Sequence, residues 1–340
     1  MKTRPATDAD LKQASPNPAF ALAIDPTRPP PGLEKAVYAI GNFDGVHRGH
    51  GAVIARTKAL ARERGAASAV LTFEPHPADY FAGRPVVFRL TPFALKRLSL
   101  QELGLEGAVF LTFDAALAGL TAEEFVENVL VERLGVGAVV VGWDFHFGKA
   151  RSGTPDFLAR AGARFGFDVE IIEKVEAHEA GQPQVVSSSA IRRALEQGDV
   201  SAAARGLGRD YAVVGVVASG QKLGRALGVP TANIALEATN RLAYGVYAVH
   251  ALVAGRSYGG VASFGVRPTA DNGAPLLETH LFDFADDIYG REIEVRFVAR
   301  IREERKFASL DALKEEMARD IARARAVLAA RPFGDSGQII

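Results

Sequence analysis

The stretch "GNFDGVHRGH", residues 41–50, holds residue types that bind phosphate. His47 and His50 stand three positions apart among three glycines. If the following helix begins near His50, both imidazoles lie at its positive end, where they can hold a polyphosphate and stabilise a leaving pyrophosphate. Gly45 and Gly49 would let the backbone approach the phosphates without a Cβ clash. The stretch therefore predicts a phosphate site.

The two histidines leave two other interpretations open. The stretch has neither the GK[ST] of a Walker loop nor the GxGxxG of a dinucleotide site. A zinc or iron site is one alternative, although the chain has no cysteine and this stretch holds only two histidines. Histidines that merely cap a helix are the other. The stretch alone does not name the chemistry.

A second polar motif, "GRALGVPTANI" at 224–234, ends with Thr231 and Asn233, two positions apart. In an extended chain these side chains face the same side, because side chains alternate along a strand. A hydroxyl and an amide oxygen side by side suit Mg²⁺, which takes oxygen ligands and keeps several waters. The alternative is a turn closed by hydrogen bonds from the same side chains.

Glu278 lies in "LLETHLFDF", residues 276–284, whose alternation is typical of a strand. It shares a face with His280 and Phe282. A carboxylate beside an imidazole at the mouth of a barrel could accept a proton from an attacking hydroxyl. From the residues alone, a solvated strand glutamate is the favoured interpretation.

A triple serine at 187–189 with Arg192 stands at a predicted helix start. Serine hydroxyls there can cap the helix, and the arginine can form two parallel bonds to a phosphate. A plain N-cap is the alternative. The group is a second candidate for phosphate binding.

In the first half of the chain, apolar runs alternate with helical segments, which predicts βαβ units and a parallel sheet. The glycine-bearing turn after its first strand is a place where such sheets bind ligands. Thr91 and Thr121 are predicted helix N-caps, and Thr121 forms a capping box with Glu124. Strands are expected at 36–41, 66–73, 106–113, 137–142 and 167–173, and helices at 50–65, 91–104, 121–135 and, as a pair, within 186–208.

From Tyr211 the pattern changes, because strand-like runs follow one another with turn residues between them. This predicts an antiparallel sheet or a small barrel. A last helix is expected from Ser309 to about Ala330. Strands are expected at 211–220, 244–255, 256–265, 276–284 and 291–302.

Composition narrows the class of protein. The chain has 340 residues, 40 Lys+Arg against 40 Asp+Glu, and no cysteine, which excludes disulfides and thiolate sites and argues against a broad nucleic-acid or membrane surface. Seven of the 17 prolines fall in the first 31 positions, so residues 1–18 are expected to be a disordered tail. We find neither an apolar run of membrane-spanning length nor the apolar core of a signal peptide, and expect a cytoplasmic protein.

The ordered set of motifs resembles the prokaryotic bifunctional riboflavin kinase/FAD synthetases, whose first domain carries the HxGH signature of the nucleotidyltransferase superfamily. The resemblance covers residues 19–331 and is far more specific than the first motif alone. Besides the two motifs above, it rests on "TFEPHP", "LTPFALKRLSL", "VVVGWDFHFGKARSGT", "VSSSAIRRAL", "GVASFGVRPT", "LETHLFDF" and "DIYGREIEVRF".

The resemblance implies two domains. Residues 19–205 would form an α/β, Rossmann-like FMN adenylyltransferase domain with a parallel sheet. Residues 206–340 would form a riboflavin kinase domain, an antiparallel β-barrel with a C-terminal helix. The implied activity phosphorylates riboflavin to FMN with ATP and then adenylylates FMN to FAD, with Mg²⁺ as cofactor and small molecules as partners.

The resemblance also implies roles for individual residues. Glu278 would be the base that activates the ribityl 5′-hydroxyl, and His47 and His50 would act on the triphosphate. Nucleotide contacts are implied for Gly41, Phe43, Asp44, Gly45, Gly49, Asp144 (where some members have asparagine), Ser187, Ser188, Ser189, Arg192, Gly224, Arg225, Thr231 and Asn233. Thr231 and Asn233 would also hold the metal. Flavin contacts are implied for Phe73, His76, Pro77 and Arg267, and a proline-shaped turn is the alternative at 73–77. By analogy, Lys222, Gly224 and Arg225 lie in one mobile loop and Arg267 in a second.

Two other functions compete with this one. The chain could be a nucleotidyltransferase with a single activity and a non-catalytic C-terminal domain, but the intact PTAN motif and Glu278 argue against it. It could instead be a flavin- or nucleotide-binding module without catalysis, but the balanced charge and both histidines argue against that.

Overall fold

The computed structural model describes residues 20–174, 176–179, 182–218, 229–266 and 275–334. The chain packs as two compact units. The α/β unit comprises Met1–Asn42, Ala52–Tyr80 and Arg97–Glu173, and the barrel unit comprises Phe43–Gly51, Phe81–Lys96 and Lys174–Ile340. Residues 47–50, called the HRGH stretch below, thus belong to the unit that contains the barrel.

The α/β unit is built on a six-stranded sheet, in the order β1-β4-β3-β2-β5-β6, and every paired strand is parallel. After β2 the chain adds β3 and β4 on one side and β5 and β6 on the other. In such sheets ligands bind outside the carboxyl ends of the strands where the order reverses, which here are the ends of β2 and β5. The strands are β1 (Ala21–Ile24), β2 (Val37–Ile40), β3 (Ser68–Glu74), β4 (Gly107–Thr112), β5 (Ala138–Gly142) and β6 (Asp168–Ile172).

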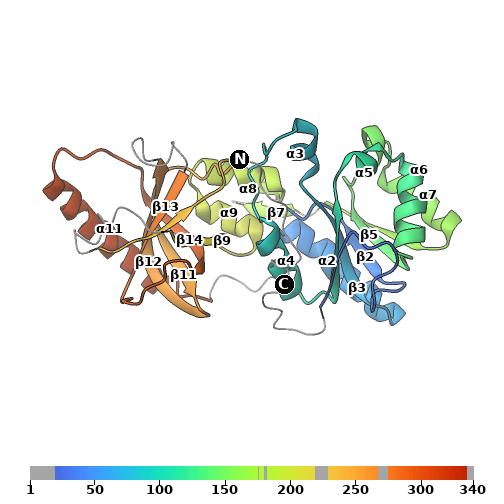
Figure 1. Ribbon diagram of the computed structural model, residues 1–340, viewed down its shortest axis with the longest axis horizontal. Helices are drawn as coiled ribbons and strands as arrows, with labels where there is room; N and C mark the ends of the chain where they lie inside the picture. Colours follow the sequence, from blue (N-terminus) through green and yellow to red (C-terminus); the bar gives the residue numbers. More distant parts are fainter. Residues whose placement is uncertain (1–19, 175, 180–181, 219–228, 267–274, 335–340) are drawn as a thin grey trace. The chain divides into compact units, whose positions relative to one another are not determined.

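Helices cover both faces of this sheet, with α2 on one side and α6 and α7 on the other (Figure 1). The central strands are continuous apolar runs because both faces are covered, and all four residues of β2 are buried. Each fully buried valine or leucine stabilises the fold by roughly 1.5–3 kcal/mol. The helices are α2 (Arg48–Arg64), α3 (Pro77–Ala82), α4 (Phe93–Glu102), α5 (Ala115–Gly119), α6 (Ala122–Glu124), the π-helix η1 (Phe125–Arg133), the 3₁₀ turn η2 (Lys149–Arg151) and α7 (Pro155–Phe165).

The structure departs from the sequence prediction at several places in this half, where helices α3, α5 and α7 were also not predicted. Strand β1 was not predicted, because a four-residue edge strand is stabilised by pairing with the distant β4, not by its own pattern. The π-helix η1 replaces part of an expected α-helix. The predicted N-cap at Thr91 is wrong, since α4 begins at Phe93 and the Thr91 hydroxyl accepts a hydrogen bond from the Gly45 amide at 2.8 Å. The Thr121–Glu124 capping box is confirmed.

The barrel unit contains an antiparallel sheet in the order β10-β13-β12-β11-β14-β9. Its two edges meet where the Ala218 amide donates to the Asn233 carbonyl at 2.8 Å, so the sheet closes into a barrel. The predicted α/β and antiparallel barrel architecture is therefore confirmed. The strands are β9 (Tyr211–Val216), β10 (Ala232–Ala235), β11 (Gly245–Val253), β12 (Arg256–Val266), β13 (Pro275–Leu281) and β14 (Glu292–Arg302), and a separate hairpin is formed by β7 (Glu176–Glu179) and β8 (Gln182–Val185).

Two short helices, α8 (Ser188–Glu196) and α9 (Val200–Leu207), pack against the barrel strands. Their buried side chains join one apolar core with Tyr211, Tyr247 and Phe297. The predicted pair of helices is confirmed. The expected boundary between domains at 205/206 stays a prediction, although α8 and α9 lie in the same compact unit as the barrel.

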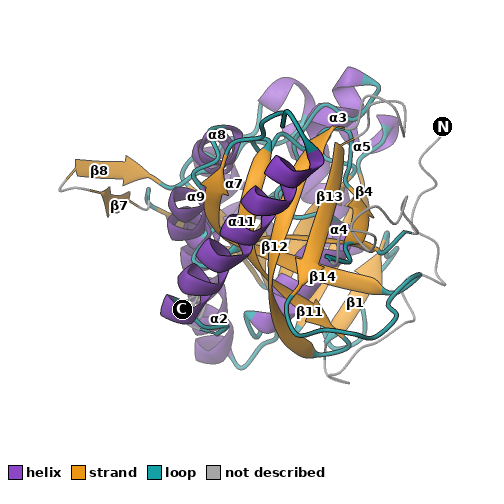
Figure 2. Ribbon diagram, turned by 90° about the vertical axis from the view of Figure 1, so that its left-hand side faces the viewer, coloured by secondary structure: helices purple, strands orange, loops and turns teal. Residues whose placement is uncertain are grey.

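The last helix, α11 (Leu310–Ala330), lies across the outside of the barrel (Figure 2). Ser309 caps it, as predicted, by accepting from the Ala312 amide. Apolar contacts of Ala324 and Leu328 hold it to the strands. The buried carboxylate of Asp320 adds a bidentate pair with Arg302 on β14, whose Nη2 donates to Oδ2 at 2.8 Å and whose Nε donates to Oδ1 at 3.1 Å.

Some predictions fall outside the described residues. They are the tail at 1–18 and the contacts expected of Lys222, Gly224, Arg225 and Arg267.

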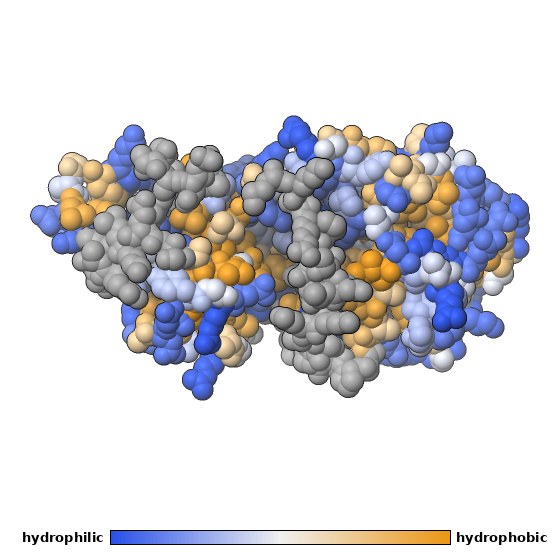
Figure 3. Space-filling model, in the orientation of Figure 1, coloured by the Kyte–Doolittle hydropathy of each residue, from blue (hydrophilic) through white to orange (hydrophobic). Residues whose placement is uncertain are grey.

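Figure 3 shows polar residues interleaved with apolar patches on the viewed face. Among the described residues, no helix has the length and apolar character needed to cross a membrane.

Candidate active sites

Residues 43–46 form a strained loop between β2 and α2. Phe43, Gly45 and Val46 have φ values of 47°, 91° and 40°, and two of these residues are not glycine. A left-handed backbone at a non-glycine residue persists only when its surroundings fix it, and such residues cluster at functional sites. A Cβ on Gly45 would also approach Leu90 Cδ1 to 3.0 Å. The loop therefore depends on its neighbours in the barrel unit.

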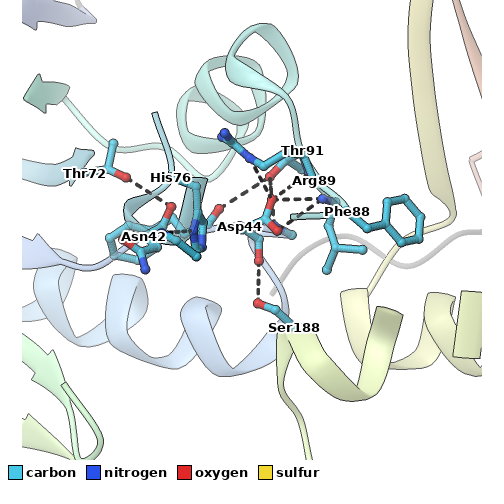
Figure 4. A network of polar contacts seen from close by, with 12 residues as sticks. Asn42, Asp44, Thr72, His76, Phe88, Arg89, Thr91 and Ser188 are labelled. Atoms are coloured by element: carbon cyan, nitrogen blue, oxygen red, sulfur yellow. Dashed lines mark hydrogen bonds and ion pairs between the residues drawn. The ribbon is translucent and has the colours of Figure 1, made fainter. Parts of the chain in front are cut away.

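The buried carboxylate of Asp44 is the centre of these contacts (Figure 4). It accepts hydrogen bonds from the Leu90 and Thr91 amides at 3.0 Å and from Arg192 Nη2 at 2.5 Å. Burial alone would raise the pKa of Asp44, but the Thr91 amide, Arg192 and Arg89 outweigh it and lower that pKa. Asp44 is therefore ionised and acts as an internal anchor.

His47 and His50 hold each other in place at the start of α2. Nδ1 of His50 accepts from the His47 amide, and Nδ1 of His47 accepts from the His50 amide, both at 3.3 Å. The rings stack with their centroids 3.7 Å apart. A ring nitrogen that accepts a hydrogen bond carries no proton, so we assign both imidazoles as neutral with the proton on Nε2. Each can then donate one N–H to a phosphate oxygen.

The surroundings agree with this neutral state. Burial lowers the pKa of His47 to about 4, and Arg209 and Arg192 act in the same direction against Asp44. Enclosure of the His50 ring, with His47, Lys96 and Arg209 nearby, lowers the pKa of His50 well below its usual value. Burial and the neighbouring cations thus favour the uncharged rings.

Gly49 of the HRGH stretch is explained by the ring of His47. A Cβ at position 49 would lie 3.1 Å from both Cε1 and Nδ1 of that imidazole and 3.4 Å from the Val186 carbonyl oxygen. The glycine therefore leaves room for the stacked histidine pair. The predicted approach of its backbone to a phosphate stays a prediction.

The serine cluster and Arg192 are tied to the same loop. Ser187 caps α8 through the Ala190 amide, and the Ser188 hydroxyl donates to the Asp44 carbonyl at 2.8 Å. Arg192 also donates from Nε to the Phe88 carbonyl at 2.8 Å. Ser187 has the capping role that the sequence left open as the alternative. The contacts of Arg192 with other described residues use Nε and Nη2, which leaves Nη1 for another acceptor.

Positive charge gathers around this loop. Among the described residues, four cations act on Asp44 or on the two histidines, namely Arg89, Lys96, Arg192 and Arg209. Cations beside neutral N–H donors at a helix start suit a polyanion such as a triphosphate.

The remaining first-half candidates lie in the α/β unit. Gly41 follows β2 and Asp144 follows β5, the two adjacent strands where the sheet order reverses. Asp144 is exposed, and its Oδ1 lies near the backbone of Gly142. Phe73 is buried in the sheet core, 6.2 Å from the ring of Phe113.

His76 and Pro77 stand at the start of α3, where Nδ1 of His76 accepts from the Ala78 amide at 3.1 Å. This bond is the local role of His76 in the structure. Flavin contacts of His76, Pro77 and Phe73 stay predictions.

The second candidate site lies on three neighbouring barrel strands. Asn233 on β10 pairs in register with Glu278 on β13, which pairs in turn with Ser263 on β12. Directly opposed residues of a sheet share a face, so these three side chains form a polar row. The adjacent row, which includes Thr279, is buried in the barrel core, as the alternation around Glu278 predicted.

A cavity of about 290 Å³ opens beside this row. Thr231, Ser263 and Glu278 line it together with His280, whose Nδ1 lies 2.8 Å from the Pro230 carbonyl. Other parts of its lining are Arg302 on β14, Phe307 in the loop that follows, and Met317 and Asp320 on α11. A cavity with a carboxylate, a hydroxyl and apolar side chains in its lining can hold a ring-bearing substrate with its hydroxyl at Glu278.

Sequence reasoning missed two contributors to these sites. Ser263 lies in "GVASFG", and only the strand register places it opposite Glu278. Arg209 stands outside every motif, yet it contacts the loop at Gly45 and Val46. No local sequence signal marks either residue, because each acts through contacts distant along the chain.

Comparison with protein families gives two matches in chain order. Residues 30–190 match the family model described as FAD synthetase, and residues 207–328 match the one described as riboflavin kinase.

Curated relatives match along both halves of the chain. A bifunctional riboflavin kinase/FMN adenylyltransferase from Pseudomonas fluorescens is 45% identical, over 86% of this chain and 93% of the relative. Proteins of the same name from Escherichia coli K12 and Bacillus subtilis are 41% and 38% identical. The alignments cover 86% and 84% of this chain and 92% and 90% of those relatives.

Among solved structures, one from Streptococcus pneumoniae is similar over 90% of this chain and 99% of its own, with a TM-score of 0.78 and 30% identity. It is described as a macrolide-efflux protein, a description that differs from those of the two family models and the curated relatives.

Proposed function

The chain belongs to the family of bifunctional riboflavin kinase/FMN adenylyltransferases, and we propose that it carries out both reactions with the residues described above. It phosphorylates riboflavin to FMN with ATP and then transfers AMP from a second ATP to FMN, which gives FAD and pyrophosphate. The match of both family models disfavours the alternative of a single-activity enzyme with a lapsed C-terminal domain. One observation supports the proposal most directly. The same chain contains the His47–His50 pair at a helix start, suited to bind phosphate, and a cavity lined by Glu278.

In the kinase reaction, Glu278 is the proposed base. The riboflavin ring occupies the cavity, and its 5′-hydroxyl gives a proton to the Glu278 carboxylate as the oxygen attacks the γ-phosphorus of ATP. ADP leaves with the former bridging oxygen. Phosphoryl transfer depends mainly on alignment and charge stabilisation. Pairing of β13 with β10 and β12 fixes the position of Glu278 and so supports its role as the base.

In the adenylyl transfer, a phosphate oxygen of FMN attacks the α-phosphorus of ATP, and the bond to the β-phosphate breaks. His47 and His50 donate their Nε2 protons to the triphosphate as hydrogen bonds and stabilise the departing pyrophosphate. Both histidines act in this proposal as neutral N–H donors, because burial lowers the pKa of His47 to about 4 and that of His50 well below its usual value. Arg192 is proposed to add a charged donor, while the predicted nucleotide contact of Asp144 stays a prediction.

Mg²⁺ is the proposed cofactor of the kinase site, held by Thr231 and Asn233. The donor set fits this ion, because Oδ1 of Asn233 is buried without a hydrogen-bond partner among the described residues, and Mg²⁺ prefers such oxygens. When bound, the ion would neutralise charge on the transferred phosphate. Among the described residues there is no cluster of three His, Cys, Asp or Glu residues for a metal.

Incubation of the purified chain with riboflavin and MgATP, followed by chromatography, tests the proposal. We expect FMN first and FAD later, with ADP and pyrophosphate as the other products. FMN alone would remove the adenylyl-transfer assignment, and flavin binding without product would favour a binding module. The cytoplasmic location and the lack of nucleic-acid partners stay predictions.

A further inference from the structure

Arg209 connects the two segments that match the family models. It belongs to the segment that matches riboflavin kinase, residues 207–328, but it contacts the 43–46 loop of the other segment. Its Nη2 donates to the Gly45 carbonyl at 2.9 Å and its Nη1 to the Val46 carbonyl at 3.1 Å. Both acceptors have positive φ and immediately precede His47. One planar guanidinium thus holds the two strained peptide groups that set the direction of the histidine.

The position of Arg209 is itself fixed from both sides. Gly208 ends α9 in the left-handed conformation, with its amide bonded to the Ala204 carbonyl. Asp210 is buried and accepts from Arg331 Nη2 at 2.5 Å, and Tyr211 begins β9 inside the barrel core. The arginine therefore extends toward the loop from a rigid base.

Arg209 also places charge beside the histidines. It is among the cations that act on both His47 and His50. The other groups that face the pair are Asp44 and Arg192 for His47, and Lys96 for His50. The guanidinium therefore has two effects, one on the geometry of the loop and one on the charge around the rings.

We propose that Arg209 is a positioning residue for adenylyl transfer, which fixes the 43–46 loop through its two carbonyl contacts and so orients His47 toward the leaving pyrophosphate. The inference rests on the proposed function of the HRGH site. It assigns a residue of the kinase segment to the chemistry of the other site. Displacing a catalytic group by about 1 Å can cost on the order of 100-fold in rate, so loss of the contacts should lower kcat.

The test uses the full chain with Arg209→Ala and Arg209→Lys. We expect Arg209→Ala to lower kcat for FMN-to-FAD conversion at least tenfold, to raise the KM for ATP because a cation beside the histidines is lost, and to leave the riboflavin-to-FMN rate unchanged. Millimolar guanidinium chloride should restore much of the lost activity, and equal sodium chloride should not. Arg209→Lys keeps the charge without the fork and should fall between wild type and Arg209→Ala.

Arg193→Ala, at an exposed position of α8, is the matched control and should behave as wild type. The inference is overturned if Arg209→Ala or Arg209→Lys converts FMN at the wild-type rate. It is also overturned if the kinase rate falls in parallel and guanidinium restores nothing, since Arg209 would then be only structural. A wild-type chain that makes no FAD from FMN would overturn the proposed function itself, and this inference with it.

Discussion

The histidines of the HRGH stretch are a reciprocal pair in which each ring accepts the other's backbone amide. The sequence left their charge open, because an imidazole at a helix start can be protonated or neutral. The stacked geometry and the nearby cations favour the neutral form of both imidazoles. Stabilisation of pyrophosphate then depends on N–H donation, while arginines supply the charge.

This assignment predicts a tautomer that can be measured. We expect ¹⁵N NMR of the free protein to show Nδ1 unprotonated and Nε2 protonated for His47 and His50 at pH 7. His47 should titrate only near pH 4, because burial lowers its pKa. Substitutions His47→Gln and His50→Gln assign the signals, and a normal titration near pH 6.5 in either residue would contradict the neutral pair.

The same shift has a consequence for stability. Below about pH 6.5 the unfolded chain binds a proton at His47, whereas the folded chain does not until about pH 4. Stability contributed by the neutral His47 is therefore lost as pH falls through this window. In His47→Gln the dependence of unfolding free energy on pH between 6.5 and 4 should be shallower, as urea titrations at several pH values would show.

Replacement of Glu278 tests its proposed role as the base. Glu278→Gln keeps the shape of the side chain but removes the base, so FMN formation should fall at least about 100-fold. Conversion of supplied FMN to FAD should remain. The opposite result is expected for His47→Gln, which should lose FAD formation and keep the kinase activity. Equal loss of both activities in either variant would argue against separate sites.

At the scale of elements, helix α11 forms one wall of the barrel cavity, so its placement matters for the second site. Asp320 is buried and holds Arg302 with two bonds. Neighbouring Glu316 is also buried and pairs with Arg305 and Arg319. These charges fix the helix on the strands in addition to its apolar contacts.

We therefore expect Asp320→Asn to destabilise the barrel unit by about 2 kcal/mol or more, because it leaves the poorly exposed Arg302 without a bidentate partner. Glu315→Gln on the same helix is the control. Its exposed pair with Arg319 should contribute less than about 1 kcal/mol. Differential scanning calorimetry measures both, and an equal effect of the two substitutions would show that the buried pair does not hold α11.

The loop 43–46 depends on several elements at once. The Leu90–Thr91 segment, α8 and Arg209 each contact it from a different part of the barrel unit. Interactions that share one loop are expected to be non-additive, because loss of any one lets the strained backbone relax. Loss of the Arg209 contacts alone is therefore expected to lower the rate of adenylyl transfer.

At the scale of the whole molecule, one chain carries two reactions in sequence, and the product of the first is the substrate of the second. Glu278, proposed for the kinase reaction, lies on barrel strand β13, and the histidine pair lies at the start of α2. FMN is a soluble anion, so passage through solution is a sufficient route between the sites.

A mixture of Glu278→Gln and His47→Gln proteins tests that route. The first variant is expected to lack the kinase and the second to lack adenylyl transfer. Together with riboflavin and MgATP they should form FAD after a lag, since FMN released by one chain is taken up by the other. Failure of the mixture, when each variant retains its single activity, would show that FMN must pass within one chain.

Much of the fold could be predicted from the sequence. Periodic apolar runs predicted β2 to β6 and the barrel strands other than the four-residue β10, and Thr121 with Glu124 and Ser309 predicted two helix starts correctly. Such signals are local, so a single sequence contains them. Strand β1 was missed because it forms by pairing with the distant β4. The cap at Thr91 was wrong because the Thr91 hydroxyl bonds to the distant Gly45 amide.

The sequence by itself determined the family, the two kinds of site and most residues proposed for them, because motif chemistry depends on residue type and spacing. Only the tertiary structure decided the neutral state of His47 and His50, the row that joins Ser263 to Glu278, and the contact of Arg209 with Gly45. Each of these depends on burial, register or a hydrogen bond between residues far apart in the chain. Such relations exist only once the chain has folded.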